Sequence, residues 1–311
     1  MKDSRSTQRR VSQGLYHPLL GTNVEIKVVA DAADAAAAQT AAEEAERRAL
    51  DEMERLQAVF TVFDPDSELC RWRSGRVEEA SVELTEVLEA AQHWWAVSGG
   101  AFHPGAAQLR ARWLRAEAEQ RLPAATELDV LAERLRELPY HCAAGIVVRT
   151  GDCSGLDLNA IAKGYIVDRG VAAAGAVAGV VDVLVNAGGD LRHAGVTPIR
   201  VGVEDPRSPG GRPIKLIELR DGAIATSGPV HRGFRIGDEW FGHVLDPRTG
   251  HPVSDRPSTT VRADDAMTAD ALATVVGVLD WAEASAVLMH LSGIGALAVL
   301  PSGEVRSLGL P

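Results

Sequence analysis

Apolar residues recur along this chain with two different spacings. In the first half and again near the end, they stand three or four positions apart, which is the period of a helix with one buried face. This spacing predicts helices at 33–59, 81–100, 107–117, 126–137, 160–174, 264–280 and 281–291.

From about residue 145 the pattern changes to short apolar runs bounded by Gly, Pro and Asp, which are typical of strands. Consecutive strands joined by short turns indicate antiparallel pairing, so the predicted fold class is α+β, with largely antiparallel sheets flanked by helices. We expect strands at 19–30, 145–149, 154–158, 180–186, 199–203, 214–220, 231–236, 240–245 and 258–262, and a closing hairpin at 295–308.

The chain of 311 residues has no internal repeat and no Pro/Ser-rich linker between its halves. Its length fits either one large domain or two ordinary ones. Because nothing in the sequence separates the halves, residues 15–311 are expected to form a single compact unit. Residues 1–14 are polar and are expected to form a disordered tail.

The net charge of −11 argues against nucleic acid or an anionic membrane as the main partner. The uncharged run at 171–181 is too short to span a bilayer, and the N-terminus lacks the apolar stretch of a signal peptide. The three cysteines include no CxxC pair and give no disulfide framework. We therefore expect a cytoplasmic protein without a transmembrane segment.

The apolar segment 264–280 contains two polar residues that need an explanation. Asp270 and Thr274 are four residues apart and share one face of the predicted helix. In one interpretation, Asp264, Asp265 or Thr268 caps the helix, Asp270 lies in its first turn and Thr274 bonds back to the carbonyl of Asp270. In the other, the carboxylate and the hydroxyl hold a hard cation such as Mg²⁺.

The segment 154–168 predicts a helix that begins beside a ligand. Asp157 lies on the opposite face of a short strand from its leucine neighbours, and Asn159 is a favourable N-cap. Lys163 follows in the first turn, where a cation is unfavourable unless an anion lies nearby. Together with Gly164, this indicates a phosphate at the helix N-terminus with a close backbone approach. The alternative is an exposed lysine and a packing glycine.

Two further segments carry weaker signals. Residues 186–190 end a strand in a Gly-Gly turn before Asp190, which is either a plain turn or a bare backbone surface for a ligand. His243 begins a predicted strand and is either a structural residue or a general base. The sequence contains no P-loop, Rossmann fingerprint, GxSxG elbow or HExxH motif.

These segments, taken in order, resemble one family. They read LLGTNVEIKV, FDPDSELCRW, SGGAFHPG, LDLNAIAKGYIVD, NAGGD, ATSG, HVLDPRTGHPV and AMTADALAT. The series is similar to the ApbE-type FAD:protein FMN transferases and covers the chain from about residue 15 to 300. The last three segments are the most specific.

The resemblance implies Mg²⁺-dependent transfer of FMN from FAD to a Ser or Thr hydroxyl of an acceptor protein, with release of AMP. It assigns the metal to the carbonyl of Ala160, the carboxylate of Asp270 and the hydroxyl of Thr274, and it makes His243 the base. Phe63 and Phe102 are expected to offer ring faces or apolar walls to the isoalloxazine or the adenine. The flavin site implied by the resemblance consists of Leu20, Phe63, Ala101, Phe102, His103, Asp157, Lys163 and Val244.

The chain departs from the family pattern at several positions. His103 replaces the aspartate of the usual Ala-Phe-Asp-Pro-Thr segment, Leu20 replaces a methionine, and Phe63 stands where tyrosine is usual. The export signal of many members is absent. Because histidine titrates near neutral pH, we expect FAD binding to tighten as the pH falls from about 8 towards 6.

Two other functions are compatible with the same residues. With water as the acceptor, the site makes a Mg²⁺-dependent FAD pyrophosphatase that yields FMN and AMP. Without catalysis, the chain is a flavin-binding protein, an alternative that the change at His103 supports. The presence of Asp270, Thr274 and His243 favours catalysis over flavin binding alone, because a binding protein would not need a base. Of the three functions we favour the transferase.

Overall fold

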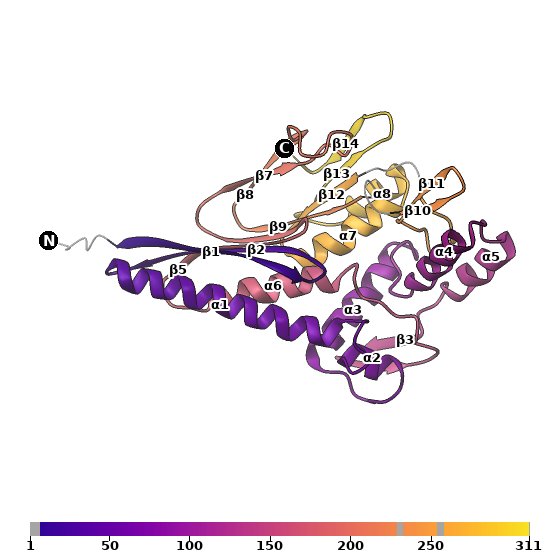
Figure 1. The fold of residues 1–311 in the computed structure, drawn as a ribbon, viewed down its shortest axis with the longest axis horizontal. Coiled ribbons are helices and arrows are strands. Elements are labelled where there is room, and N and C mark those ends of the chain that lie inside the picture. Colours follow the sequence, from indigo (N-terminus) through magenta and orange to yellow (C-terminus); the bar gives the residue numbers. More distant parts are fainter. Residues whose placement is uncertain (1–6, 229–232, 254–257, 311) are drawn as a thin grey trace.

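A single eight-stranded sheet organises the computed structural model, which describes residues 7–228, 233–253 and 258–310. Every neighbouring pair of its strands is antiparallel, which confirms the predicted fold class (Figure 1). The strands in spatial order are β1 (Gln8–Leu19), β2 (Thr22–Ala32), β5 (Val180–Ala187), β6 (Asp190–Gly195), β9 (Gly222–Ser227), β12 (Ser258–Ala263), β13 (Gly295–Val299) and β14 (Val305–Leu308).

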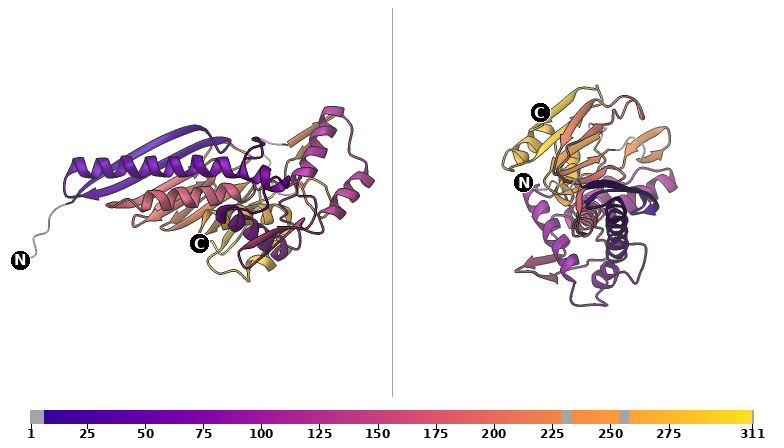
Figure 2. Two further views of the ribbon diagram at one scale, coloured as in Figure 1. Left: turned by 90° about the horizontal axis from the view of Figure 1, so that it is seen from below. Right: turned by 90° about the vertical axis from the view of Figure 1, so that its left-hand side faces the viewer.

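The two faces of the sheet are covered differently, because successive strand residues point to opposite sides. In β9, Ala223 and Ala225 belong to the main core, whereas Ile224 packs on the other face. The main core lies under α1 (Ala35–Phe60), α6 (Ala162–Gly175) and α7 (Ala266–Val278). The opposite face is covered by the hairpin of β7 (Ile199–Val203) and β8 (Lys215–Leu219). Figure 2 shows α1 and α6 lying side by side along the molecule.

The remaining elements extend the structure beyond the sheet. A third core gathers around Trp113, whose ring contacts Phe234 and Phe241. No helix in the described part of the chain is long and apolar enough to cross a membrane. The other elements are α2 (Glu68–Arg73), α3 (Val82–Val97), α4 (Ala107–Glu119), α5 (Ala125–Arg134), β3 (Tyr140–Ala143), β4 (Ile146–Arg149), β10 (Gly233–Ile236), β11 (Glu239–Gly242) and α8 (Trp281–Leu288).

The expected disordered tail is wrong for residues 8–14, which form the first part of β1 and pair with β2. This strand is held to α1 as well, because the hydroxyls of Ser12 and Tyr16 both donate to the carboxylate of Glu46. Residues 1–6 lie outside the described part of the chain. The first part of β1 was not predicted as a strand because its residues are mostly polar. An edge strand needs few apolar side chains.

Other strand predictions were partly correct. The expected strand at 154–158 is wrong, because these residues form a turn and irregular backbone. Strands β3, β6 and β9 were not predicted from the sequence. The cysteine prediction is confirmed, since all three thiols are free and buried.

Helices α6 and α7 approach each other closely at Gly164. A Cβ at this position would lie 2.2 Å from the carbonyl oxygen of Ala266 and 2.7 Å from Cα of Met267. From the sequence, two interpretations of Gly164 were open, the close approach of a ligand and a packing glycine. The backbone of α7 occupies the space beside Gly164, so the interpretation as a packing glycine is confirmed and the one as a ligand contact is wrong.

We predict that Gly164→Ala destabilises the protein by about 1–3 kcal/mol, the usual cost of inserting a methyl group into a packed interface. The matched control is Gly175→Ala at the end of the same helix, where no atom lies within 4 Å of the added Cβ. That change should be neutral or stabilise by up to about 1 kcal/mol, because alanine favours the helix. Urea unfolding of the two variants measures the difference, and equal stabilities would contradict the packing argument.

Candidate functional site

A buried carboxylate joins α7 to the first turn of α6. Asp270, in the second turn of α7, is 8% exposed, and its Oδ2 accepts a hydrogen bond of 3.2 Å from the backbone N–H of Gly164. Helix α6 has no side-chain cap of its own, because its N-cap residue is Ile161. An N–H group that the helix leaves unpaired is thus satisfied by a residue 106 positions away. This contact explains why an acidic residue stands in such an apolar helix.

Two local predictions for these helices are resolved by the same geometry. Asp265 is the N-cap of α7 and accepts from Thr268 N–H at 2.7 Å, so the predicted acidic cap is confirmed. Asn159 is not the N-cap of α6, because the helix begins two residues later than predicted. Its backbone and side-chain nitrogens donate instead to the carboxylate of Asp157, at 2.9 and 3.1 Å.

Lys163 forms an ion pair with a residue that the sequence analysis left undecided. Its Nζ contacts Oδ2 of Asp190, which begins β6 and is 2% exposed. The Gly188–Gly189 turn therefore places the buried carboxylate of Asp190 beside the start of α6. The sequence signal for this role was weak, because Gly-Gly-Asp is common in ordinary turns.

The carboxylates at this junction are shifted towards their neutral forms. Burial raises the pKa of Asp270 to about 8, and the nearby charge of Asp190 acts in the same direction. Burial also raises the pKa of Asp190 and raises that of Asp168 to about 6. Lys163 opposes the first two shifts and Arg192 the third. A further cation bound at this junction would favour the ionised forms of these carboxylates, and the ionised carboxylates would in turn stabilise the cation.

The donors that the sequence assigned to the metal are a carboxylate, a hydroxyl and a carbonyl, the oxygen ligands that a hard cation prefers. Thr274 follows one turn later on α7 and is partly buried, and Ala160 lies two residues before α6. The described residues contain no group of three or more His, Cys, Asp or Glu side chains arranged to hold a metal ion. Mg²⁺ does not need such a group, because it is usually held by one or two carboxylates together with substrate phosphates and water.

Two of the segments assigned to the flavin lie against each other. The backbone N–H of Asp157 donates to the carbonyl of Pro104 at 2.8 Å, which ties residues 156–160 to the loop at 101–105. A guanidinium N–H of Arg73 holds the same segment by donating to the carbonyl of Leu156 at 2.7 Å. Arg73 was not singled out from the sequence, because nothing in its own segment indicates this distant contact.

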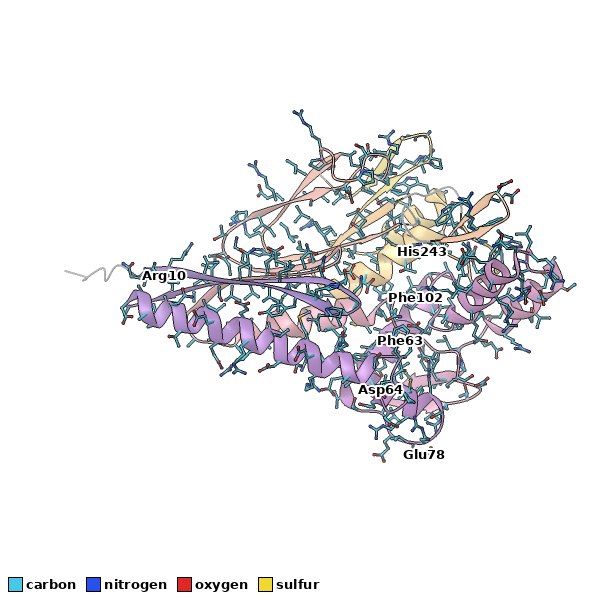
Figure 3. The ribbon with its side chains drawn as sticks, viewed as in Figure 1. Arg10, Phe63, Asp64, Glu78, Phe102 and His243 are labelled. Atoms are coloured by element: carbon cyan, nitrogen blue, oxygen red, sulfur yellow. The ribbon has the colours of Figure 1, made fainter. Side chains whose placement is uncertain are left out.

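The loop at 101–105 is a buried support. Ala101 and Phe102 are each 1% exposed and belong to the main core. The expectation that Phe102 offers a ring face is therefore wrong in this structure. Phe63, in contrast, is 90% exposed in the loop after α1, so its ring is available to a ligand. Figure 3 shows the positions of both residues.

His103 has a buried ring with both nitrogens engaged. Its Nδ1 accepts from Gly105 N–H at 2.8 Å, and its Nε2–H donates to the carbonyl of Glu137 at 3.3 Å. Burial lowers the pKa of His103 to about 4. The expectation that this residue makes FAD binding depend on pH between 8 and 6 is therefore wrong, because the ring stays neutral across that range.

The other predicted flavin and catalytic residues occupy two separate turns. Leu20 connects β1 to β2 with a φ of 53°, and its N–H donates to Gln57 Oε1 at 2.6 Å. His243 lies in a bend after β11, so its placement at the start of a strand was wrong. Val244 lies near α7, since its Cγ1 would be 3.8 Å from a Cβ on Gly277. Figure 3 shows His243 beside α7 in that view.

Comparison with known proteins identifies relatives across nearly the whole chain. The sequence model of the ApbE family matches residues 20–298. A protein of Treponema pallidum named FAD:protein FMN transferase is 31% identical over 247 residues, which cover 72% of this chain and 67% of that protein. One of the same name from Rhodobacter capsulatus is 30% identical over 251 residues, covering 75% of this chain and about half (47%) of that protein.

A solved structure confirms the fold. The ApbE protein of Thermotoga maritima superposes with a TM-score of 0.80 at 27% sequence identity. The superposition covers 96% of this chain and 97% of that one. The same arrangement of strands and helices is therefore shared over almost the full length of both chains.

We predict that the ring of His103 remains neutral from pH 8 to pH 6 and gains a proton only below about pH 5, since burial lowers its pKa to about 4. NMR titration of its ring resonances measures this directly, with His103→Gln used to assign the signals. The FAD affinity of wild type and His103→Gln should then follow parallel pH profiles between 8 and 6. A ring that titrates near pH 6.5 would contradict the buried geometry.

Proposed function

This chain belongs to the ApbE family, and from that premise we propose that it transfers FMN from FAD to a Ser or Thr hydroxyl of an acceptor protein. The observation that carries the proposal is the junction of α6 and α7. There the buried carboxylate of Asp270 meets the first turn of α6, beside the Lys163–Asp190 ion pair. Such a junction combines a cation-accepting group with a cationic side chain, as a pyrophosphate substrate requires.

The proposed metal ligands are the carboxylate of Asp270, the hydroxyl of Thr274 and the carbonyl of Ala160. A bound Mg²⁺ would neutralise negative charge on the transferring phosphoryl group. Lys163 adds a second positive charge near the substrate, and Asp190 holds its ammonium group at the start of α6. The buried pair restricts the lysine before the substrate arrives.

The proposed reaction exchanges the phosphoanhydride bond of FAD for a phosphoester bond to the acceptor. The acceptor hydroxyl oxygen bonds to the phosphorus of the FMN half of FAD, and the pyrophosphate bond to AMP breaks. His243 takes the hydroxyl proton, because the neutral hydroxyl is a weak nucleophile. AMP leaves with the bridging oxygen, so the products are AMP and a protein carrying FMN on a Ser or Thr.

The flavin nucleotide is proposed to lie between the turns that carry Leu20 and Val244 and the segment that carries Asp157. The exposed ring of Phe63 is suited to stack on isoalloxazine or adenine. The buried Ala101, Phe102 and His103 act beneath this surface. They fix the loop that holds Asp157 through the Pro104 carbonyl.

Mass spectrometry of candidate acceptor proteins tests the proposed function. Incubation with this chain, FAD and Mg²⁺ should add to an acceptor the mass of FMN less one water, and release one AMP per label. Release of FMN and AMP without labelling would instead make the chain a FAD pyrophosphatase. Bound FAD without any turnover would make it a flavin-binding protein.

We predict that Asp270→Asn lowers turnover by about 10²-fold or more, because a charge-stabilising group is lost from the transition state. The thermal melt should change little, since the amide oxygen can still accept from Gly164 N–H. Asp264→Asn, at an exposed carboxylate just before the same helix, is the matched control and should leave turnover unchanged. Full activity of wild type in excess chelator would overturn the metal assignment.

We also predict that His243→Asn slows FMN transfer by about 10²–10⁴-fold, the usual contribution of a general base. FAD binding, followed by flavin fluorescence, should remain close to that of wild type, because only hydroxyl activation is lost. His251→Asn, an exposed histidine in the neighbouring turn, serves as control. If His243→Asn binds no FAD, the residue belongs to the binding site and another group is the base.

A further inference from the structure

We propose that Asp168 is a positioning residue, which sets the metal ligands on α7 against the start of α6. This inference rests on the proposed function, because it concerns the geometry of that metal site. The carboxylate of Asp168 lies on α6, yet both of its oxygens accept from the backbone of α7. Oδ1 accepts from Ala266 N–H at 2.8 Å and Oδ2 from Met267 N–H at 2.9 Å.

The N-terminus of α7 is therefore held by two carboxylates with different tasks. Its own N-cap, Asp265, accepts from Thr268 N–H and completes the helix locally. Asp168 takes the first two N–H groups from another helix, so its bonds fix the position of α7 as a body. Since Asp168 is four residues after Gly164, it faces α7 on the same side as the tight backbone contact.

The carboxylate of Asp168 is itself anchored to the sheet. Arg192 on β6 lies 3.5 Å from its Oδ1, two residues after the Asp190 that pairs with Lys163. Two ion pairs therefore join β6 to α6. Asp190 of β6 pairs with Lys163, and Arg192 of β6 pairs with Asp168. These two ion pairs fix α6 on the sheet. The hydrogen bonds of Asp168 then fix α7 relative to α6.

The proposed metal ligands are divided between these two helices. Ala160 precedes α6, whereas Asp270 and Thr274 follow Ala266 on α7. Any sliding of α7 along α6 changes the separation of the ligands, and misplacement of about 1 Å can be costly to catalysis. A helix cap alone would not need a second carboxylate, and this one is half-buried, with a side chain that is 21% exposed. Its partial removal from water raises the pKa of Asp168 to about 6.

The test compares Asp168→Asn with Asp265→Asn. Each variant removes one negative charge near the N-terminus of α7. At position 265 asparagine still caps the helix. At position 168 the amide has only one acceptor oxygen and places an NH₂ group against the second N–H. The first variant disturbs the link between the helices, and the second disturbs only the charge.

The primary measurement is Mn²⁺ binding by EPR in the absence of FAD, with Mn²⁺ in place of Mg²⁺. We expect Asp168→Asn to weaken Mn²⁺ binding by about 10–100-fold, as groups that orient metal ligands do, and Asp265→Asn to change it by less than about twofold. In turnover, the Mg²⁺ concentration for half-activation should rise while KM for FAD stays constant. Asp168→Glu keeps the charge but shifts the oxygens, so it should also bind Mn²⁺ weakly.

Each result decides the proposal. Equal Mn²⁺ affinity of Asp168→Asn and wild type would overturn it and leave the proposed function intact. Equal loss in both asparagine variants would show that charge, not position, is responsible. If Asp168→Asn does not fold, Asp168→Glu decides alone, and full recovery there overturns the positioning role. A wild type that binds no Mn²⁺ would remove the metal site, and this inference with it.

Discussion

The contact between α6 and α7 is the constraint on which the rest of the site depends. The helices meet through backbone, because Gly164 has no side chain to separate them from Ala266. At that distance the N–H of Gly164 reaches the carboxylate of Asp270, and Asp168 reaches the end of α7. The small residues of β9 beneath these helices, Ala223 and Ala225, belong to the same core. The sheet, the two helices and the polar junction are therefore one packing arrangement.

This packing also explains the electrostatics of the junction. Carboxylates that lose water and approach one another become harder to ionise, which is why the pKa of Asp270 rises to about 8. Lys163 and Arg192 compensate part of the charge from two sides. An additional cation would lower the electrostatic energy of this junction. The described residues around it contain no cluster of histidines or cysteines.

Much of the architecture could be predicted from the sequence, because apolar residues recur at helical spacing in α1 and α3, and a nearly continuous apolar run marks α7. The misses have physical reasons. β1 is a polar edge strand, and β6 and β9 are short strands beside glycine turns. Asn159 is a residue type that favours the N-cap, but its backbone N–H donates to the carboxylate of Asp157 instead. His103 was given the pKa of a free imidazole, whereas its burial could not be read from neighbouring residues. The role of Asp168 depends on a helix about 100 residues away.

The alternation of β9 and its neighbours between two cores has a consequence for how this protein can change over evolutionary time. In β9, Ala223 and Ala225 on one side support α7, and Ile224 on the other side packs in the core beneath the β7–β8 hairpin. A substitution at Ile224 therefore alters the packing of the hairpin, whereas one at Ala225 alters the packing of the helix. Because a larger side chain at either alanine would push against α7, we expect evolutionary change to be more restricted at these two positions than on the hairpin side.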